Sequence, residues 1–202
     1  MQPALPERAQ ALLDFWFGPQ GDPEREAHRP IWFKSTPEHD AMLRQLFLAD
    51  HERAAAGALA AWEVAAESAL ALLLLLDQIP RNIFRDSPGA YATDAAALAA
   101  ADRALARGFD TAVPPTWRKF FYMPLHHSEN LADQRRATAL TASLPDDRAH
   151  GDRKERGGLG RYGLPYVDVI ERFGRFPHRN AILGRPSTPE ETAFMEQAKA
   201  SG

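Results

Sequence analysis

Three stretches of the sequence place charged, amide or imidazole side chains beside aromatic residues and leucines, a mixture that a plain hydrophobic core does not need. They run from Leu76 to Phe84, from Phe120 to Glu129 and from Phe173 to Arg185. A lone charge in such apolar surroundings loses several kcal/mol of solvation free energy. These side chains are therefore expected to pair with one another or with a ligand.

The first stretch holds a carboxylate and a guanidinium at helical spacing around a proline. Asp77 ends the most apolar segment of the chain, and Arg81 follows four residues later, directly after Pro80. Carboxylate–arginine pairs are bidentate and directional, so this pair can position a functional group, or it can simply close the proline break. The candidate ligand-binding residues of this stretch are Asp77, Gln78, Arg81 and Asn82.

The second stretch contains two histidines followed by a serine and a glutamate. Adjacent residues of a helix diverge by about 100°, so His127, Ser128 and Glu129 cannot form a catalytic triad, and no ligand spacing predicts a metal site. A helical projection places His126 toward water and His127 beside the buried face. We therefore predict that His126 is exposed and His127 largely buried. Because histidine titrates near neutrality, the candidate catalytic residues are His127, Glu129 and, in the third stretch, His178.

The third stretch gathers cationic groups around a glycine turn. Arg175, His178 and Arg179 follow Gly174 within five positions. Guanidinium forks and free N–H groups at such a turn suit a carboxylate or phosphate ligand. Alternatively, the Arg and Asn side chains cap neighbouring helix ends. The candidate ligand-binding residues here are Arg175, His178, Arg179 and Asn180.

We predict that the three stretches converge in space. The converging residues would be Asp77, Arg81, His127, Glu129, Arg175, His178 and Arg179. Two carboxylates would then face three guanidinium groups, and this cationic excess suits an anionic ligand. The first functional hypothesis is therefore binding, with or without turnover, of a small anionic metabolite in a polar pocket between helices.

The sequence around the three stretches consists mostly of segments with the signals of helices. The motif Ser-Thr-Pro-Glu occurs at 35–38 and at 187–190, where a hydroxyl cap, a proline and an acidic first turn favour a helix start. No alternating β pattern of useful length occurs, so we predict an all-α fold with at least seven helices and no sheet. The expected helices include 9–17 ended by Gly18, 62–79 ended by Pro80, 94–107 stopped by Gly108, 124–142 opened by Pro124, and 165–173 stopped by Gly174.

Burial can also be predicted from these patterns. Trp32 and Phe33 are expected to tuck inward within the Pro-rich stretch that precedes residue 35, and residues 145–164 are expected to form a loop. The predicted core includes Trp16, Phe47, Leu70, Leu73, Leu74, Leu76 and Phe121.

The length and composition of the chain are those of a globular protein. A length of 202 residues, with 45% hydrophobic and 25% charged residues, predicts a single globular domain over residues 1–202. The absence of cysteine excludes disulfides and thiolate zinc sites, and it fits a reducing compartment. The longest apolar run, Ala69–Leu76, is far shorter than the roughly 20 residues of a membrane span, and no secretory signal is recognisable. We therefore expect a cytoplasmic protein without a membrane partner.

Neither cofactor nor nucleic-acid binding is predicted. The chain has no phosphate loop and no dinucleotide fingerprint, so no cofactor is expected. Residues 117–185 carry 13 Lys or Arg against 8 Asp or Glu, an excess of five positive charges. However, the net charge of the whole chain is −3 and only four residues are lysine, which disfavours nucleic acid as a partner.

The same three stretches carry a family resemblance. The motifs are Asp77–Asn82, Tyr122–Leu125 with His127–Glu129, and Arg172–Asn180 followed by Leu183–Arg185, with Phe15–Gly18 and Trp32–Phe33 near the start. Through them the chain resembles, nearly end to end, the family known as domain of unknown function 924. The resemblance implies a tetratricopeptide-like fold of stacked antiparallel helix hairpins in a right-handed superhelix. It implies no activity. His126 departs from the apolar residue usual in the family, and Tyr166 stands where members often have histidine.

The second functional hypothesis follows from that implied fold. Stacked helix hairpins can present a groove to a protein or peptide, which would make the chain an interaction module. Its signature would be an exposed apolar surface, with the polar motifs engaged internally at helix ends. The signature of the metabolite pocket would instead be a cavity into which at least four of the candidate side chains point.

Overall fold

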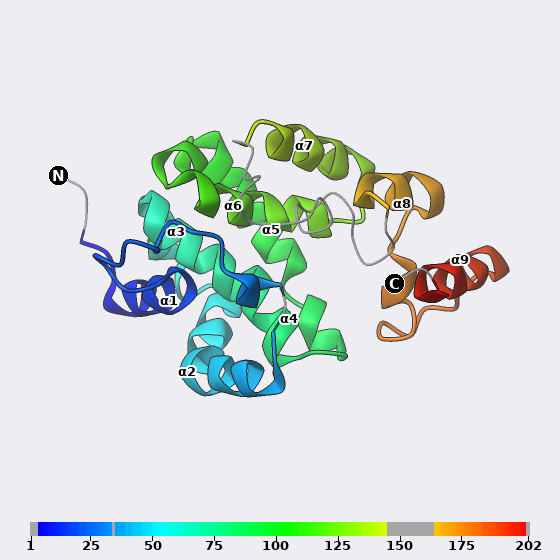
Figure 1. Ribbon diagram of the computed structural model, residues 1–202, viewed down its shortest axis with the longest axis horizontal. Helices are drawn as coiled ribbons and strands as arrows, with labels where there is room; N and C mark the ends of the chain where they lie inside the picture. Colours follow the sequence, from blue (N-terminus) through cyan, green and yellow to red (C-terminus); the bar gives the residue numbers. More distant parts are fainter. Residues whose placement is uncertain (1–3, 34, 145–163, 201–202) are drawn as a thin grey trace. The chain divides into compact units, whose positions relative to one another are not determined.

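The computed structural model describes residues 4–33, 35–144 and 164–200, so nearly all of the predicted loop at 145–164 lies outside the described residues. Helices account for most of the described chain, and no strand occurs in it (Figure 1). The predicted all-α fold with at least seven helices is therefore confirmed. None of the described helices is long and apolar enough to cross a membrane.

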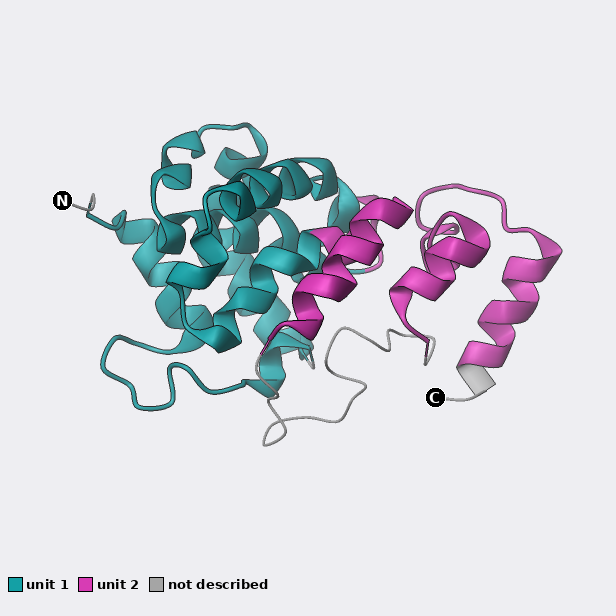
Figure 2. Cartoon of the chain, turned by 90° about the horizontal axis from the view of Figure 1, so that it is seen from above, with its two compact units in different colours: residues 1–85, 89–124 teal, residues 86–88, 125–202 magenta. Residues whose placement is uncertain are grey.

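The chain divides into two compact units (Figure 2). Unit 1 comprises Met1–Arg85 and Gly89–Pro124, and unit 2 comprises Asp86–Pro88 and Leu125–Gly202. The boundary between Pro124 and Leu125 falls inside helix α6 (Pro115–His127). The expectation of a single domain over residues 1–202 stays a prediction.

Unit 1 is built around α3, which packs against α1 and α5, while α2 packs against α4. All seven predicted core residues are buried, so the sequence pattern identified this core correctly. Of the aromatic pair near the start, Trp32 is buried, but Phe33 is 38% exposed, contrary to the prediction. The elements of unit 1 are α1 (Glu7–Phe17), η1 (Pro30–Trp32), α2 (Pro37–Ala55), η2 (Ala60–Val64), α3 (Ala66–Leu73), η3 (Leu74–Gln78), α4 (Ile79–Ile83), α5 (Asp94–Ala106), η5 (Phe109–Ala112) and the first part of α6, with η4 (Pro88–Tyr91) at the boundary of the unit.

Unit 2 contains α7 (Leu131–Ala142), α8 (Tyr166–Phe173), the single turn η7 (Pro177–Arg179) and α9 (Pro189–Ala200). Helix α7 packs against α8, and η7 packs against α9. Gly174 ends α8 with a φ of 66°, a left-handed conformation that glycine adopts without strain. The core of this unit consists of Val169, Ile170, Phe176 and Phe194.

The predicted helix starts at the two Ser-Thr-Pro-Glu motifs are confirmed. The hydroxyl of Thr36 accepts a hydrogen bond from the backbone N–H of His39 at the start of α2. The hydroxyl of Thr188 accepts one from the N–H of Glu191 at the start of α9. In both helices proline occupies the first position, where its missing N–H costs nothing.

The prediction that Pro80 ends the central helix is wrong. After α3, the chain makes a π-helical turn, η3, and continues as α4 through Pro80 to Ile83. The π turn shifts the hydrogen-bond register, and the N–H of Ile79 bonds to the carbonyl of Leu74. Helical geometry therefore survives the proline, at the cost of carbonyl groups that need other donors.

The prediction that Pro124 opens a helix reaching residue 142 is also wrong. Pro124 lies inside α6, and a new helix, α7, begins after Asn130, whose side chain caps it by accepting a bond from Ala132 N–H. An interior proline costs about 3 kcal/mol. Here the buried side chains of Phe120 and Phe121 before it and Leu125 after it outweigh that cost.

The histidine prediction fails for the same reason. His126 is only 5% exposed, whereas His127 is half-buried. The helical projection treats residues 124–142 as one helix, whereas both histidines end α6 and α7 begins only at Leu131. In α6, His126 lies one turn after the buried Tyr122 and shares its face.

Candidate functional site

The first motif surrounds the π turn of unit 1, where four consecutive backbone carbonyls accept hydrogen bonds from side chains. Leu76 would normally bond to the N–H of the fourth residue onward, but that residue is Pro80, which has none. Buried carbonyls left without donors would each cost about 1–3 kcal/mol. The donors are His51 Nδ1 to Leu75 (2.8 Å), Thr93 Oγ1 to Leu76 (2.6 Å), Arg81 Nη1 to Asp77 (2.8 Å) and Asn82 Nδ2 to Gln78 (3.1 Å).

The predicted ion pair between Asp77 and Arg81 is present. Arg81 Nη1 lies 3.4 Å from Asp77 Oδ1, and the carboxylate is only 1% exposed. The same guanidinium contacts both oxygens of Asp94, at 2.9 and 3.0 Å. Burial lowers the pKa of Arg81, but the two carboxylates raise it more, so the net shift is upward and the group stays charged. Gln78 Nε2 donates to the other oxygen of Asp77.

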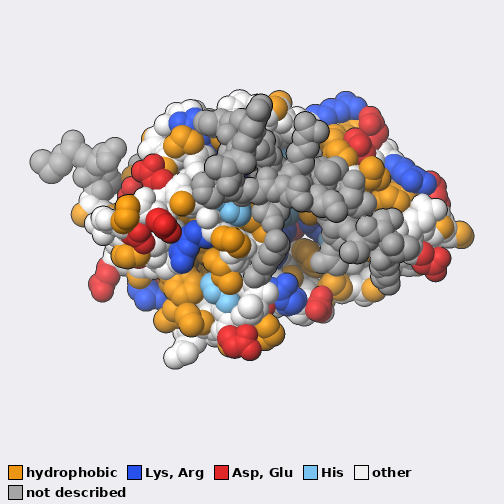
Figure 3. All heavy atoms as spheres, in the orientation of Figure 1, with side chains coloured by type: hydrophobic (Ala, Val, Ile, Leu, Met, Phe, Trp, Pro, Cys, Tyr) orange, Lys and Arg blue, Asp and Glu red, His pale blue; other side chains and the backbone are white. Residues whose placement is uncertain are grey.

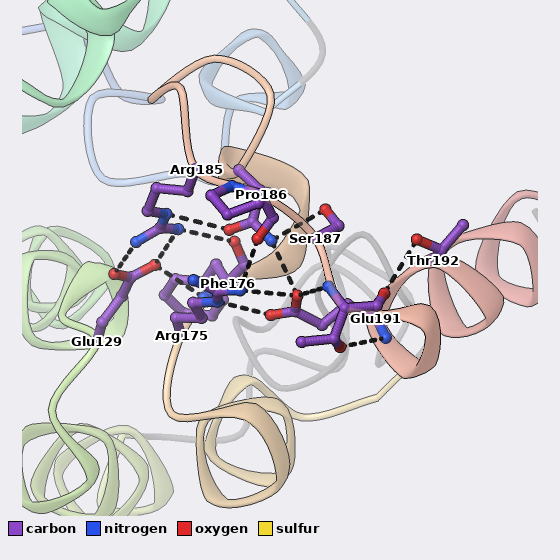
Figure 4. A network of polar contacts seen from close by, with 10 residues as sticks. Glu129, Arg175, Phe176, Arg185, Pro186, Ser187, Glu191 and Thr192 are labelled. Carbon is purple, nitrogen blue, oxygen red and sulfur yellow. Dashed lines mark hydrogen bonds and ion pairs between the residues drawn. The ribbon is translucent and has the colours of Figure 1, made fainter.

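The second and third motifs meet in unit 2, at a pair that sequence reasoning missed (Figure 4). Arg185 binds Glu129 through two N–H···O bonds, of 2.7 and 2.9 Å. The pair also holds the backbone of Phe176, whose N–H donates to Glu129 (2.8 Å) and whose carbonyl accepts from Arg185 (3.2 Å). Burial raises the pKa of Glu129, but the bonds from Arg185 and Phe176 outweigh it and lower the pKa overall. Glu129 is therefore ionised at neutral pH.

A second bidentate pair fixes the start of α9. Arg175 Nε and Nη2 contact the two carboxylate oxygens of Glu191, at 2.6 and 2.9 Å, and Nη2 also donates to the carbonyl of Pro186 (2.9 Å). Glu191 in turn accepts the N–H of Thr188 (2.7 Å), which completes a reciprocal capping box. These bonds, led by the one from Arg175, lower the pKa of Glu191 to about 2.

The remaining residues of the third motif are also engaged. Arg179 donates to the backbone carbonyl of His127 (2.9 Å), and its guanidinium carbon lies 4.6 Å from the ring centre of Phe176. The buried Asn180 donates to Ser187 Oγ and to Glu191, and it accepts from Arg185. The ring of His178 lies 5.6 Å from that of Phe176.

The structure thus brings together part of the predicted cluster. Within unit 2, Glu129, Arg175 and Arg179 belong to one network, and His127 joins it through its carbonyl. Asp77 and Arg81 pair within unit 1. Convergence of these two groups stays a prediction.

The hydroxyl and imidazole groups of the second motif bond to partners outside any catalytic triad. The hydroxyl of Ser128 donates to the carboxylate of Asp133 (2.7 Å), which holds the serine without removing its proton in the manner of an imidazole. His126 Nε2 lies 2.8 Å from Thr141 Oγ1. Among the described residues, no group of three or more His, Asp or Glu side chains could hold a metal ion.

Comparison with known proteins gives the family. The family model described as a bacterial protein of unknown function (DUF924) matches residues 12–199. The solved structure of a protein of unknown function from Agrobacterium tumefaciens is similar to this chain, with 40% sequence identity and a TM-score of 0.78. That match covers 94% of this chain and 97% of the other. Comparison with curated proteins gives no match. The chain belongs to the DUF924 family of bacterial proteins of unknown function.

Proposed function

We propose that this protein is a cytoplasmic interaction module, and that its three polar motifs form the scaffold of a surface that binds a segment of another protein. One observation carries the proposal: the motif side chains already bond to backbone groups and carboxylates within each unit. The absence of cysteine, which fits a reducing compartment, supports the cytoplasmic location.

The strongest support comes from the arginines. Arg175 and Arg185 each have a bidentate carboxylate partner, and Arg81 forms an ion pair with Asp94 that includes one hydrogen bond. An anionic ligand would have to displace these carboxylates and leave them unpaired, which costs several kcal/mol for a buried carboxylate such as Glu191. The amide groups of Asn82 and Asn180 are likewise engaged with neighbouring acceptors.

The finer architecture belongs to the same proposal. Stacked antiparallel hairpins in a right-handed, tetratricopeptide-like superhelix would expose helix faces along which an extended or helical segment can bind. In that arrangement the motifs hold the backbone in place around three prolines, two of which lie within continuous helical segments. This role accounts for their position at Pro80, Pro124 and Pro177.

A small anionic metabolite remains the second candidate. In its favour, the network of unit 2 contains three arginines, Arg175, Arg179 and Arg185, against two glutamates, Glu129 and Glu191. In unit 1, a π turn lies beside the buried Asp77, and such turns recur at functional sites. In this function His127, Glu129 and His178 would be the acid–base candidates.

The two functions predict opposite outcomes in one pair of experiments. Affinity enrichment with the full chain as bait, followed by titration calorimetry with the purified partner, should give a saturable complex with a negative heat-capacity change, because apolar surface is buried. A panel of phosphorylated and carboxylated metabolites should leave the melting temperature unchanged.

The proposal would be wrong if no saturable protein complex formed while one metabolite raised the melting temperature. That metabolite should then lose its effect in folded Arg175→Ala and Arg179→Ala variants, since both side chains would be its ligands.

A further inference from the structure

Helix α2 presents an exposed apolar stripe beside its buried one. Met42 is 49% exposed and Leu46 is 42% exposed, and Ala49 is exposed as well. These positions are spaced by four and three residues, so they share one face of the helix. The adjacent residues Leu43 and Phe47 are fully buried. The exposed stripe therefore lies alongside the face of α2 that packs into unit 1.

One edge of this stripe, together with its C-terminal end, carries more positive than negative charge. Arg8 Nε lies 2.9 Å from Asp50 Oδ2, and its Nη2 donates to the carbonyl of Leu46 (2.7 Å), which places the guanidinium beside the stripe. Arg53, one turn after Ala49 on the same face, lies 3.7 Å from the other oxygen of Asp50. Two guanidinium groups thus share one carboxylate. The opposite edge carries the exposed residues Gln45 and Glu52 and no arginine of α2.

We propose that this α2 stripe docks an amphipathic helix of a partner protein, with acidic residues along one flank of its apolar face. The apolar positions would cover Met42 and Leu46, and the acidic flank would lie against Arg8 and Arg53. Helix-on-helix docking of this kind uses anchors spaced by three, four and seven residues, which matches the spacing on α2. The inference rests on the proposed function and specifies the surface and the chemistry of the partner.

The charge arrangement favours a helix with an acidic flank over an apolar helix whose flanks carry no charge. An acidic flank would neutralise the positive charge that Asp50 leaves uncompensated, whereas a basic flank would be repelled. These arginines are at the rim of the stripe and reach water, so their contribution should fall as salt screens it. Binding by this partner should therefore weaken with ionic strength.

A synthetic peptide pair provides the probe. Each peptide, of about 18 residues so that helix formation is feasible, carries leucines at helical spacing. One has glutamates on one flank of the leucine stripe and glutamine elsewhere, and the other has lysines in place of the glutamates. Fluorescence anisotropy should show that the full chain binds the glutamate peptide about tenfold more tightly or better, a difference of about 1.4 kcal/mol.

Matched variants locate the binding. Met42→Glu and Leu46→Glu should each weaken binding of the glutamate peptide about tenfold or more, since a charge would replace an apolar anchor. Arg53→Gln should remove most of the preference for glutamate over lysine. Val64→Glu is the control, because Val64 is 59% exposed and belongs to η2 and not to the α2 stripe, so this change should leave binding as in the wild type. All four positions are exposed, so the far-ultraviolet circular dichroism of each variant should match the wild type.

Three results would overturn the inference. The first is the absence of a preference for the glutamate peptide, and the second is equal weakening by Val64→Glu and Met42→Glu. The third is a concentration-dependent dimer in light scattering that Met42→Glu abolishes, because the stripe would then bind a second copy of the chain.

Failure here can be separated from failure of the proposed function. If an enriched natural partner binds the Met42→Glu and Leu46→Glu variants as tightly as the wild type, α2 is not the docking face but the module remains. If no protein partner binds and a metabolite stabilises the chain, the proposed function itself fails.

Discussion

Glu191 meets two requirements at the start of α9 with a single carboxylate. Its carboxylate accepts a hydrogen bond from the N–H of Thr188 in the capping box. It also accepts bonds from Nε and Nη2 of Arg175, which lies in the segment after α8. The side chain is only 2% exposed, so the ionised form depends on these donors for the solvation it has lost. The lowered pKa of Glu191 is the electrostatic signature of that dependence.

Glu191→Gln should therefore destabilise the protein in a pH-dependent way. The folded-state pKa of about 2 lies below the ordinary value of 4.5, so the carboxylate stabilises the fold above about pH 4.5 and this contribution is lost as the pH falls through about 2. We expect a loss of about 2 kcal/mol near neutral pH, shrinking toward zero in strong acid. Urea unfolding at several pH values measures it.

Glu190→Gln is the matched control for this change. Glu190 is the neighbouring residue and forms an exposed pair with Arg172, so its replacement should change stability by less than about 0.5 kcal/mol. Equal effects of the two substitutions, or a Glu191 effect that does not vary with pH, would show that the capping network contributes no specific stability.

The hydrogen bond of His51 determines which of its ring nitrogens carries the proton. Its Nδ1 lies 2.8 Å from the carbonyl oxygen of Leu75, and a carbonyl can only accept, so the proton must be on Nδ1. Nitrogen-15 NMR of the neutral ring should therefore show a protonated Nδ1 and an unprotonated Nε2. The reverse assignment would mean that His51 does not donate to the π turn.

At the scale of elements, the two interior prolines explain most of what sequence reasoning got wrong. Pro80 and Pro124 both look like helix boundaries, because proline lacks an N–H and crowds the preceding turn. In the fold, buried apolar side chains on both sides of each proline keep the helix going. Such packing depends on contacts distant in sequence, which local patterns do not contain.

Other boundaries could be predicted because their causes are local. The capping residues Thr36 and Thr188 start helices, and Gly108 and Gly174 adopt the left-handed conformations expected of helix stops. The repeated apolar positions of α1 likewise identified a buried face correctly. These signals need only a few adjacent residues.

The candidate site was predictable in part for the same reason. The Asp77–Arg81 pair lies within one helical turn, and the sequence revealed it. The Glu129–Arg185 pair spans 56 positions, and nothing local distinguishes Arg185 from other arginines. Glu191 was recoverable, because Thr188 and Glu191 have the spacing of a capping box.

Thr93→Val tests the account of the π turn. The hydroxyl of Thr93 replaces the N–H that Pro80 cannot offer to the carbonyl of Leu76, and valine has the same shape without the donor. We expect a loss of about 1–3 kcal/mol in the free energy of unfolding. Thr111→Val is the control, since Thr111 is exposed and bonds only to the nearby carbonyl of Gly108. Equal effects of the two changes would contradict the assignment.

At the scale of the whole molecule, one visible face can be described by its charges. On the face drawn in Figure 3, Lys and Arg side chains of the described residues alternate with Asp and Glu. Several arginines of the described residues are held in ion pairs, such as Arg103 with Glu63 and Arg172 with Glu190. A phosphate backbone attracts uncompensated positive charge, and whether nucleic acid binds this chain stays a prediction.

We propose that the polar motifs have a structural role in the fold and are not ligand-binding sites. The Glu129–Arg185 pair is the most informative part, because it links the end of α6 to the segment before α9 and holds both backbone groups of Phe176. A structural pair lowers stability when it is broken. A ligand-binding arginine commonly raises stability or leaves it unchanged when it is replaced, since binding sites are built at some cost to the fold.

The most direct measurement is the free energy of unfolding of Arg185→Gln in urea without any added ligand. The structural account predicts a loss of about 2 kcal/mol, because Glu129 and the carbonyl of Phe176 each lose a donor. Arg135→Gln, which breaks an exposed pair with Glu171, should change stability by less than about 0.5 kcal/mol. Unchanged or increased stability of Arg185→Gln would contradict the account and favour a ligand site in this network.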